Sequence, residues 1–188
     1  MDRNGGDVTE HFCTYFDANY LARGLALFTS LKRHVRRFRL YVLCLDRATW
    51  QALRDLREPD LVPVALETFE AGDAKLMKAK QDRSTVEYYF TCTPSWLLFV
   101  FRSFPEVERL TYVDADLFLF DDPSQVFAEL GGRPVWITPH RHPDRLRHLD
   151  QYGLYNVNFL VFQRDDRALQ CLQDWRERCL EWCHDRVE

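Results

Sequence analysis

The sequence predicts an α/β domain in which helices flank a largely parallel β-sheet. Short apolar segments of strand type alternate with amphipathic helical patterns along the chain, and this alternation is typical of βαβ units. The segment FRLYVLCL at 38–45 is apolar on both faces, as expected for a parallel strand that helices cover on both sides. No repeat or low-complexity segment interrupts the pattern, so the sequence indicates one domain over residues 1–188.

Each predicted strand is a short run of β-branched, aromatic and aliphatic residues between turn-forming residues. These strands are expected at 10–16, 38–45, 61–66, 109–114, 117–120, 134–139 and 156–162. Each predicted helix shows apolar residues at helical spacing. These helices are expected at 20–34, 47–57, 84–91, 94–104, 123–130 and from 166 onward. Residues 67–82 carry alternating charges and few apolar anchors, and they are expected to be helical or irregular.

Capping residues and a proline set the predicted ends of several helices. Asn19 and Asp46 each precede a helical pattern, where their side chains can accept free main-chain N–H groups. Ser84 and Glu87 have the spacing of a capping box. Pro94 is expected to open a second helix, because proline is favoured at a first helical position and disrupts a helix interior.

Composition limits the classes of protein that this sequence fits. The 188 residues are 46% hydrophobic and 14% aromatic, which excludes a disordered chain. The net charge of −4 gives no general attraction to nucleic acid or to an anionic membrane. No apolar run approaches the roughly 20 residues that span a bilayer. The polar start MDRNGGDVTEHF lacks the features of a signal peptide, so we expect a cytoplasmic protein.

Glycine and cysteine usage narrows the kinds of site further. The chain has seven glycines and no G-x-G-x-x-G or Walker loop, so a glycine cradle would not hold a nucleotide diphosphate here. A metal held by carboxylates would be the substitute. The six cysteines form no Cys-x-x-Cys pair. Cys179, Cys183 and His184 could share a helix face and contact a soft metal, but no fourth ligand is in sight.

The segment LTYVDADLFLF at 110–120 carries the strongest chemical signal. In a strand, residues i and i+2 share a face, so Asp114 and Asp116 would present two carboxylates to the same side. Burying unpaired carboxylates in so apolar a run is costly without a cation or hydrogen-bond donors. Two hard oxygen ligands suit Mg²⁺ or Mn²⁺. The alternative is a solvated turn ahead of a helix, which the apolar flanks on both sides disfavour.

Two predicted turns are expected to meet at one edge of the sheet. In open parallel sheets, ligands bind beyond the carboxyl ends of the strands. The turn at 14–20 and the Asp-Ala-Asp junction both follow predicted strands, and together they indicate a binding cleft. The first helix ends in a basic cluster that either complements the C-terminus of this helix or forms a docking patch. It consists of Lys32, Arg33, Arg36, Arg37 and Arg39.

Four segments in order resemble one family of enzymes. They are FCTYFDANYLARGLALFTSL, RSTVEYYFTCTP, VERLTYVDADLFLF, and YNVNFLVF ahead of a tryptophan-bearing helix. With this set, which spans nearly the whole chain, the sequence resembles glycosyltransferases of the GT-A fold. It is most similar to the retaining superfamily that includes glycogenin and bacterial lipopolysaccharide galactosyltransferases. The resemblance implies a Rossmann-like, mostly parallel sheet and a nucleotide-sugar-binding domain.

The resemblance also implies roles for particular residues. The nucleoside would be held by the first turn, through Thr14, Tyr15, Asp17, Asn19 and Tyr20. Asp114 and Asp116 would bind Mn²⁺ (or Mg²⁺) bridging the diphosphate, with Ala115 also in the donor site and Asp114 near the ribose. Asn156 would face the donor sugar. The implied donor is a UDP-sugar, and the implied reaction is metal-dependent glycosyl transfer with retention to an unknown acceptor. The sequence offers no convincing nucleophile.

The sequence departs from the family pattern in three places. Phe90 stands where relatives often have a basic residue, and Arg83, about two helical turns earlier, is a possible replacement. Asn158 stands where relatives often have glycine. Relatives continue with an Asp-Gln segment and a later histidine that completes the metal site, whereas this chain stops at Glu188. We therefore expect a C-terminally incomplete domain whose third metal ligand lies beyond residue 188.

Two other functions fit parts of the sequence. His140 and His142 follow a predicted strand and could join Asp114 and Asp116 in a hydrolytic metal centre. The chain could also be a non-catalytic module that binds a nucleotide sugar without turnover. In each case the expected partner is a small molecule rather than nucleic acid.

Overall fold

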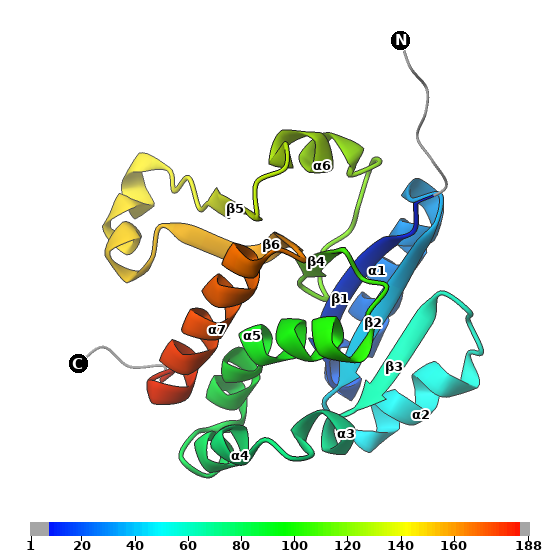
Figure 1. Ribbon diagram of the computed structural model, residues 1–188, viewed down its shortest axis with the longest axis horizontal. Coiled ribbons are helices and arrows are strands. Elements are labelled where there is room, and N and C mark those ends of the chain that lie inside the picture. The colour runs from blue at the N-terminus through cyan, green and yellow to red at the C-terminus, as the bar shows by residue number, and fades with distance from the viewer. Residues whose placement is uncertain (1–7, 185–188) are drawn as a thin grey trace.

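The computed structural model describes residues 8–184; the polar start of the sequence and its end at Glu188 lie outside the described residues. One six-stranded sheet has the order β3-β2-β1-β4-β6-β5 (Figure 1). Its strands are β1 (Glu10–Phe16), β2 (Phe38–Cys44), β3 (Leu61–Ala65), β4 (Arg109–Val113), β5 (Val135–Pro139) and β6 (Tyr155–Gln163). Strand β6 runs antiparallel to both β4 and β5, and the other neighbouring pairs among these described strands are parallel. The predicted α/β class with a mostly parallel sheet is confirmed.

Helices cover both faces of this sheet. They are α1 (Leu21–His34), α2 (Arg47–Asp55), α3 (Leu66–Glu70), α4 (Ala74–Gln81), α5 (Thr85–Ser103), α6 (Ser124–Leu130) and α7 (Asp166–Glu181), with 3₁₀ turns η1 (Ala18–Tyr20) and η2 (Asp144–Tyr152). Figure 1 shows α5 and α7 side by side, and both contribute to one buried core. Helix α1 contributes to a second core. No helix within residues 8–184 is long and apolar enough to cross a membrane.

Alternating side chains divide each strand between the two cores. Cys13 of β1 and Tyr112 of β4 belong to the core under α5 and α7. Phe12 and Val113, their chain neighbours, belong to the core under α1. This division follows from the strand period of two, and it decides which rim residues can meet one another.

Helix α5 is continuous where the sequence predicted two helices. Its 19 residues run through Pro94, so the predicted break at this proline is wrong. The predicted capping box is present, because the main-chain N–H of Ser84 donates to Glu87 Oε2 at 2.8 Å and that of Glu87 donates to Ser84 Oγ. All residues of 91–98 are buried. Their burial against the sheet and α7 offsets the hydrogen bond that Pro94 cannot donate.

The residues at 117–120 do not form the predicted strand. The main-chain N–H of Leu117 donates to the Asp114 carbonyl at 3.1 Å and closes a turn. Farther on, the N–H of Leu119 donates to Ser30 Oγ of α1 at 3.1 Å. These donors are bonded to a turn and to a helix rather than to a neighbouring strand, so the apolar alternation there reflects packing and not sheet pairing.

The cap of the first turn also differs from the prediction. The carboxylate of Asp17, rather than the side chain of Asn19, accepts the free main-chain N–H groups, from Asn19 at 3.0 Å and Tyr20 at 3.3 Å. Asp46 caps α2 as predicted, accepting from the N–H of Thr49 at 2.7 Å. The cap therefore lies two residues earlier than predicted, because the 3₁₀ turn η1 precedes α1 and Asp17 is its N-cap.

The segment at 67–82 was expected to be helical or irregular. It folds into the two short helices α3 and α4. Glu70 at the end of α3 is buried and accepts from Tyr88 Oη at 2.7 Å and Lys80 Nζ at 2.6 Å. A buried carboxylate needs such partners. This network ties α3 and α4 to α5. In the basic cluster at the end of α1, Lys32 pairs with Glu58 at 2.9 Å.

Candidate functional site

Polar side chains converge where β1, β4 and β6 meet at one end. Cys13, Tyr112 and Leu160 form one row across these strands. Residues two positions apart in a strand share a face. The same face therefore carries Tyr15 on β1, Asp114 just after β4, and Asn158 on the antiparallel strand β6. The main-chain N–H of Asp114 donates to the Asn158 carbonyl at 2.9 Å. These residues therefore lie together at the carboxyl end of the parallel strands.

A chain of aromatic and hydroxyl contacts supports Asp114. We call Tyr15, Thr93, Tyr112 and Asp114 the rim cluster. The Tyr15 and Thr93 hydroxyl oxygens lie 3.0 Å apart, and the Tyr15 ring centroid lies 5.9 Å from that of Tyr112. Tyr112 Oη donates to Asp114 Oδ1 at 2.8 Å. Burial raises the pKa of Tyr15 to about 12 and that of Tyr112 well above its ordinary value, so both hydroxyls keep their protons.

The two aspartates lie in a turn rather than on a continuing strand, and this corrects the geometry expected from strand alternation. Asp114 is half-buried and Asp116 is exposed. Burial raises the pKa of Asp114; the hydrogen bond from Tyr112 opposes this rise, and the negative charge of Asp116 adds to it. The two carboxylates are therefore close enough to repel one another.

No cation compensates this pair in the described part of the chain. Across residues 8–184, neither Asp114 nor Asp116 takes part in an ion pair, and Tyr112 is the one side chain that donates to either carboxylate. An uncompensated, half-buried carboxylate beside a second one fits a hard divalent cation with oxygen ligands. No group of three or more His, Cys, Asp or Glu side chains suited to a metal gathers within 8–184.

The turn after β1 is fastened to the end of β2. The main-chain N–H of Ala18 donates to Asp46 Oδ2 at 2.8 Å, while Asp46 Oδ1 caps α2. Asn19 Nδ2 donates to Asp17 Oδ2 at 3.1 Å. Tyr20 remains exposed, with the Arg23 guanidinium 4.4 Å from its ring centroid. The turn is thus rigid at its base and offers an exposed aromatic ring.

Asn156 and Asn158 occupy the sheet strand next to Asp114. Both are half-buried on β6, and their even positions share a face with Leu160. Asn156 Oδ1 accepts from the main-chain N–H of Asn158 at 3.1 Å. The Asn158 side chain itself has no hydrogen-bond partner among the described residues, so its amide is free to bond elsewhere.

Comparisons with known proteins place this geometry in a known fold. No protein-family model matches the chain. In sequence, the chain is 36% identical to Uncharacterized protein YfnF and 31% identical to Uncharacterized protein YfnD, both of Bacillus subtilis (strain 168), over 94% and 93% of its own length. It spans 60% and 56% of these two relatives, respectively.

Solved structures resemble the chain over nearly all of its length. Mouse xyloside xylosyltransferase 1 superposes with a TM-score of 0.61 at 16% identity, covering 94% of this chain and 78% of that one. The glycosyltransferase GlyE of Streptococcus pneumoniae TIGR4 gives 0.59 at 15% identity, with 96% and 41% covered. The galactosyltransferase LgtC gives 0.55 at 14% identity, with 91% and 65% covered. The chain has the GT-A glycosyltransferase fold.

Within the GT-A fold, the structure separates two residues that the sequence analysis grouped in the first turn. Tyr15 belongs to the rim cluster, whereas the adjacent Thr14 is fully buried and its hydroxyl has no hydrogen-bond partner. As a strand neighbour of Tyr15, Thr14 points to the face that α1 covers. A ligand at the rim would therefore meet the Tyr15 side chain and not that of Thr14.

Arg83 lies apart from the rim cluster. It precedes the α5 cap, and its Nη2 donates to the Leu180 carbonyl of α7 at 3.0 Å. No hydrogen bond or ion pair connects Arg83 with Asp114 or Asp116 in the described residues. Phe90, at the position where relatives often have a basic residue, is 55% exposed. The expected role of Arg83 at the donor remains a prediction.

Three residues at the GT-A rim were not named by the sequence analysis. Tyr112 and Thr93 belong to the rim cluster, and Tyr89 lies one α5 turn before Thr93. Tyr89 is half-buried, and its pKa is raised by burial and by the charges of Asp17 and Asp46. The i, i+4 spacing of Tyr89 and Thr93 would have revealed their shared face, but the predicted break at Pro94 obscured the one long helix. The i, i+2 spacing of Tyr112 and Asp114, which places both side chains on one face of the strand, was already visible in the sequence.

The hydrolytic centre does not form in the described residues. His140 and His142 stack on each other with ring centroids 4.8 Å apart. They gather with neither Asp114 nor Asp116, since residues 8–184 contain no cluster of three or more such ligands. The two histidines lie in the segment between β5 and η2, which does not bring them to the rim, so this hypothesis was wrong for the part of the chain described.

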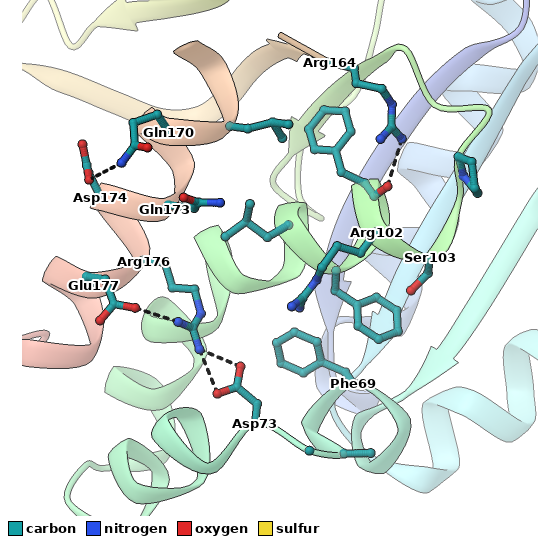
Figure 2. Close-up of a pocket in the computed structure, with 17 residues that line it drawn as sticks. Phe69, Asp73, Arg102, Ser103, Arg164, Gln170, Gln173, Asp174, Arg176 and Glu177 are labelled. Atoms are coloured by element: carbon teal, nitrogen blue, oxygen red, sulfur yellow. Dashed lines mark hydrogen bonds and ion pairs between the residues drawn. The ribbon is translucent and has the colours of Figure 1, made fainter. Parts of the chain in front are cut away.

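A large hollow lies elsewhere on this GT-A domain. It measures about 940 Å³ and is lined by α3, the C-terminal half of α5, and α7. Figure 2 shows Arg176 reaching across it to Asp73, which it meets at 2.7 Å, while also pairing with Glu177. Arg164 at its edge donates to the carbonyls of Phe101 and Phe104. Most of the charged side chains that line this hollow form ion pairs or hydrogen bonds that hold the helices together. None of its lining residues belongs to the rim cluster.

Replacing Tyr112 by Phe is expected to raise the pKa of Asp114 further, because the Tyr112 hydroxyl opposes the effect of burial.

The pKa of Asp114 in the folded protein is already above its value in the unfolded chain. The contribution of Asp114 to stability is therefore fully present below its unfolded pKa and is lost as pH rises through its folded pKa. At neutral pH and without metal, Asp114→Asn is expected to be more stable than wild type. Carboxyl NMR titration and urea unfolding measure the two effects; an unchanged Asp114 pKa in Tyr112→Phe would contradict the first.

Proposed function

We propose that this chain binds a nucleotide-diphospho-sugar, with a UDP-sugar as the donor, and forms the donor-binding part of a metal-dependent glycosyltransferase. One observation carries the proposal. In a GT-A fold, the carboxylates of Asp114 and Asp116 lie side by side at the sheet rim without a compensating cation among the described residues. Such a pair is suited to a divalent ion that bridges to phosphate oxygens.

Asp114 and Asp116 would hold Mn²⁺ or Mg²⁺, since they offer three carboxylate oxygens without a hydrogen-bond donor in residues 8–184. When bound, the ion would stabilise negative charge on the leaving diphosphate. The hydroxyl of Tyr112 fixes the Asp114 carboxylate at 2.8 Å. This contact keeps one ligand oriented before the donor arrives, which reduces the ordering cost of binding.

The remaining rim residues would contact the donor on either side of the diphosphate. The exposed ring of Tyr20 and the half-buried ring of Tyr89 flank the turn after β1 and offer apolar faces to a uracil base. Asn156 and Asn158 offer amide groups next to Asp114, where hydroxyl groups of the sugar would accept or donate hydrogen bonds. Retention of configuration is part of the proposal, and no residue is assigned as a nucleophile.

The comparisons support this proposal at the level of the fold. The LgtC structure is described as a complex with donor and acceptor sugar analogues, so that protein binds both with this architecture. The chain spans 60% of YfnF and 56% of YfnD. Transfer of the sugar to an acceptor, and the acceptor itself, therefore belong to the proposal.

Calorimetric titration of the 188-residue chain with UDP tests the function. UDP is expected to bind at least about tenfold more tightly with Mn²⁺ than with EDTA, because a metal contact to phosphate is worth a few kcal/mol. ADP, GDP and CDP under the same conditions are the controls for the base. Equal UDP affinity with and without metal, or no preference for uridine, would contradict the proposal. Release of UDP from UDP-sugars then separates a transferase from a binding module.

A further inference from the structure

Another hollow, which we call the basic hollow, lies at the amino end of β1. It measures about 410 Å³, which is within the range of small-ligand pockets. The seven residues of β1 place it roughly 20 Å from the rim cluster at the other end of this strand. The polar side chains that line it are those of Thr9, Lys32, Arg36, Arg37, Arg39 and Asp60.

Cations outnumber acids in this lining by four to one. Lys32 is held by Glu58 at 2.9 Å. Arg39 Nη1 lies 3.9 Å from Glu106, and both side chains are about half-exposed, so this pair is weak. Arg36 is exposed, and its side chain makes no hydrogen bond or ion pair with any residue of 8–184. The basic hollow therefore carries positive charge that its own surroundings do not neutralise.

The C-terminus of α1 accounts for only part of the basic cluster. Lys32 and Arg33 lie in the last turn of the helix, where positive charges interact favourably with the helix dipole. Arg36 and Arg37 follow the helix, and Arg39 is the one exposed residue of β2. The effect of the dipole falls off within the last turn. The arginines that line the hollow are therefore those that the helix end does not require.

The backbone that carries these arginines is fixed by its neighbours. Val35 and Phe38 are 8% and 4% exposed and belong to the core under α1. The main-chain N–H of Glu10 donates to the Arg37 carbonyl at 3.0 Å and ties the segment to β1. The segment is thus ordered before any ligand arrives, which reduces the ordering cost of binding.

We propose that the basic hollow binds a small molecule through a phosphate or pyrophosphate group. The planar fork of arginine donors matches the oxygens of phosphate. Several cations around one hollow suit an ion with more than one negative charge better than a single carboxylate. The Thr9 hydroxyl in the lining offers a further donor. Since the rim cluster takes no part, this inference is independent of the proposed nucleotide-sugar function.

The lining of the basic hollow favours a soluble ligand over a membrane or a nucleic acid strand. Its apolar lining residues, Val35 and Phe38, are buried, so they offer no side chain that could enter a lipid layer. Phe38 is also the one aromatic residue in the lining, which leaves no exposed ring for stacking bases. A lipid headgroup presents the same phosphate chemistry, so the experiment separates the two sources.

Calorimetric titration of the 188-residue chain with sodium pyrophosphate in EDTA tests this inference. EDTA removes the metal on which the rim would depend. Pyrophosphate is expected to bind, and the affinity should fall as the salt concentration rises. Arg36→Gln with Arg39→Gln should weaken binding about tenfold or more, because charge-assisted hydrogen bonds are lost. Both side chains are exposed, and circular dichroism establishes that the variant is folded.

Arg145→Gln with Arg178→Gln is the matched control, since both arginines are exposed and neither lines the basic hollow. This variant has the same change in net charge and should bind pyrophosphate as wild type does. Equal effects of the two double variants, or no binding of pyrophosphate to wild type, would overturn the proposal.

Two further measurements locate the anion and its source. Asp114→Asn with Asp116→Asn should retain pyrophosphate binding in EDTA, and loss of binding in this variant would place the anion at the rim and overturn the proposal. Sedimentation with phosphatidylcholine vesicles that contain phosphatidic acid tests the lipid source. The chain should stay in the supernatant; pelleting with these vesicles in the absence of pyrophosphate affinity would overturn the proposal in favour of a membrane surface.

Discussion

A double variant with Asp114→Asn and Asp116→Asn is expected to lose manganese-dependent UDP binding, with a drop in affinity of about a hundredfold or more. Asparagine keeps the size of the side chain and removes both negative charges, so a divalent cation loses its paired anionic ligands. Calorimetry with UDP and Mn²⁺ measures the loss. The fold should survive, because Asp114 is half-buried with a raised pKa and its charge does not stabilise the folded state.

Asp121→Asn with Asp122→Asn is the matched control, since it changes the net charge equally within the same loop. The carboxylates of Asp121 and Asp122 accept main-chain N–H groups at 2.8 Å and 2.7 Å, and asparagine can still accept these bonds. UDP affinity should remain close to that of wild type. Equal effects of the two double variants would show that general charge, rather than the Asp-Ala-Asp pair, governs binding.

Trp96→Ala is expected to lower the free energy of unfolding by about 3–5 kcal/mol. Trp96 is fully buried in α5, with the rings of Phe69 and Phe99 at centroid distances of 5.9 Å and 5.5 Å. Alanine would leave a cavity between α3 and α5 that these rings cannot fill without moving. Urea unfolding followed by circular dichroism measures the change.

Trp182→Ala is the control for loss of an indole, because Trp182 is 46% exposed and should cost under about 1 kcal/mol. Trp96→Ala should also weaken UDP binding, since α5 positions Thr93 against Tyr15 at the rim. A Trp96 variant as stable as Trp182→Ala would contradict the packing described for α5.

Local sequence patterns were sufficient for much of this protein. Apolar segments between turns located the strands that form the sheet, because a buried strand needs apolar residues whatever its neighbours are. The capping box of Ser84 and Glu87 could also be predicted, because its two partners are only three residues apart in the sequence. The Asp114 and Asp116 motif likewise combines neighbouring residues, so the sequence alone was enough to predict a metal site there.

The tertiary structure decided what depends on distant partners. Pro94 lies inside α5 because burial on the sheet and α7 compensates for one lost hydrogen bond. Residues 117–120 form no strand because Ser30 of α1 accepts from Leu119. The turn at Asp17 is fastened by Asp46, 28 residues from Ala18 in the sequence. In each case the competing interactions come from elements that a local pattern does not contain.

The same distinction holds within the sites. Sequence alone determined that two carboxylates stand together after an apolar strand and that six cysteines lack a Cys-x-x-Cys pair. Only the fold placed Tyr112, Tyr15 and Thr93 in contact behind Asp114, and brought Arg83 to the end of α7. The sequence determines which chemical groups are present. Desolvation and the charges of residues distant in the sequence determine the protonation and reactivity of those groups.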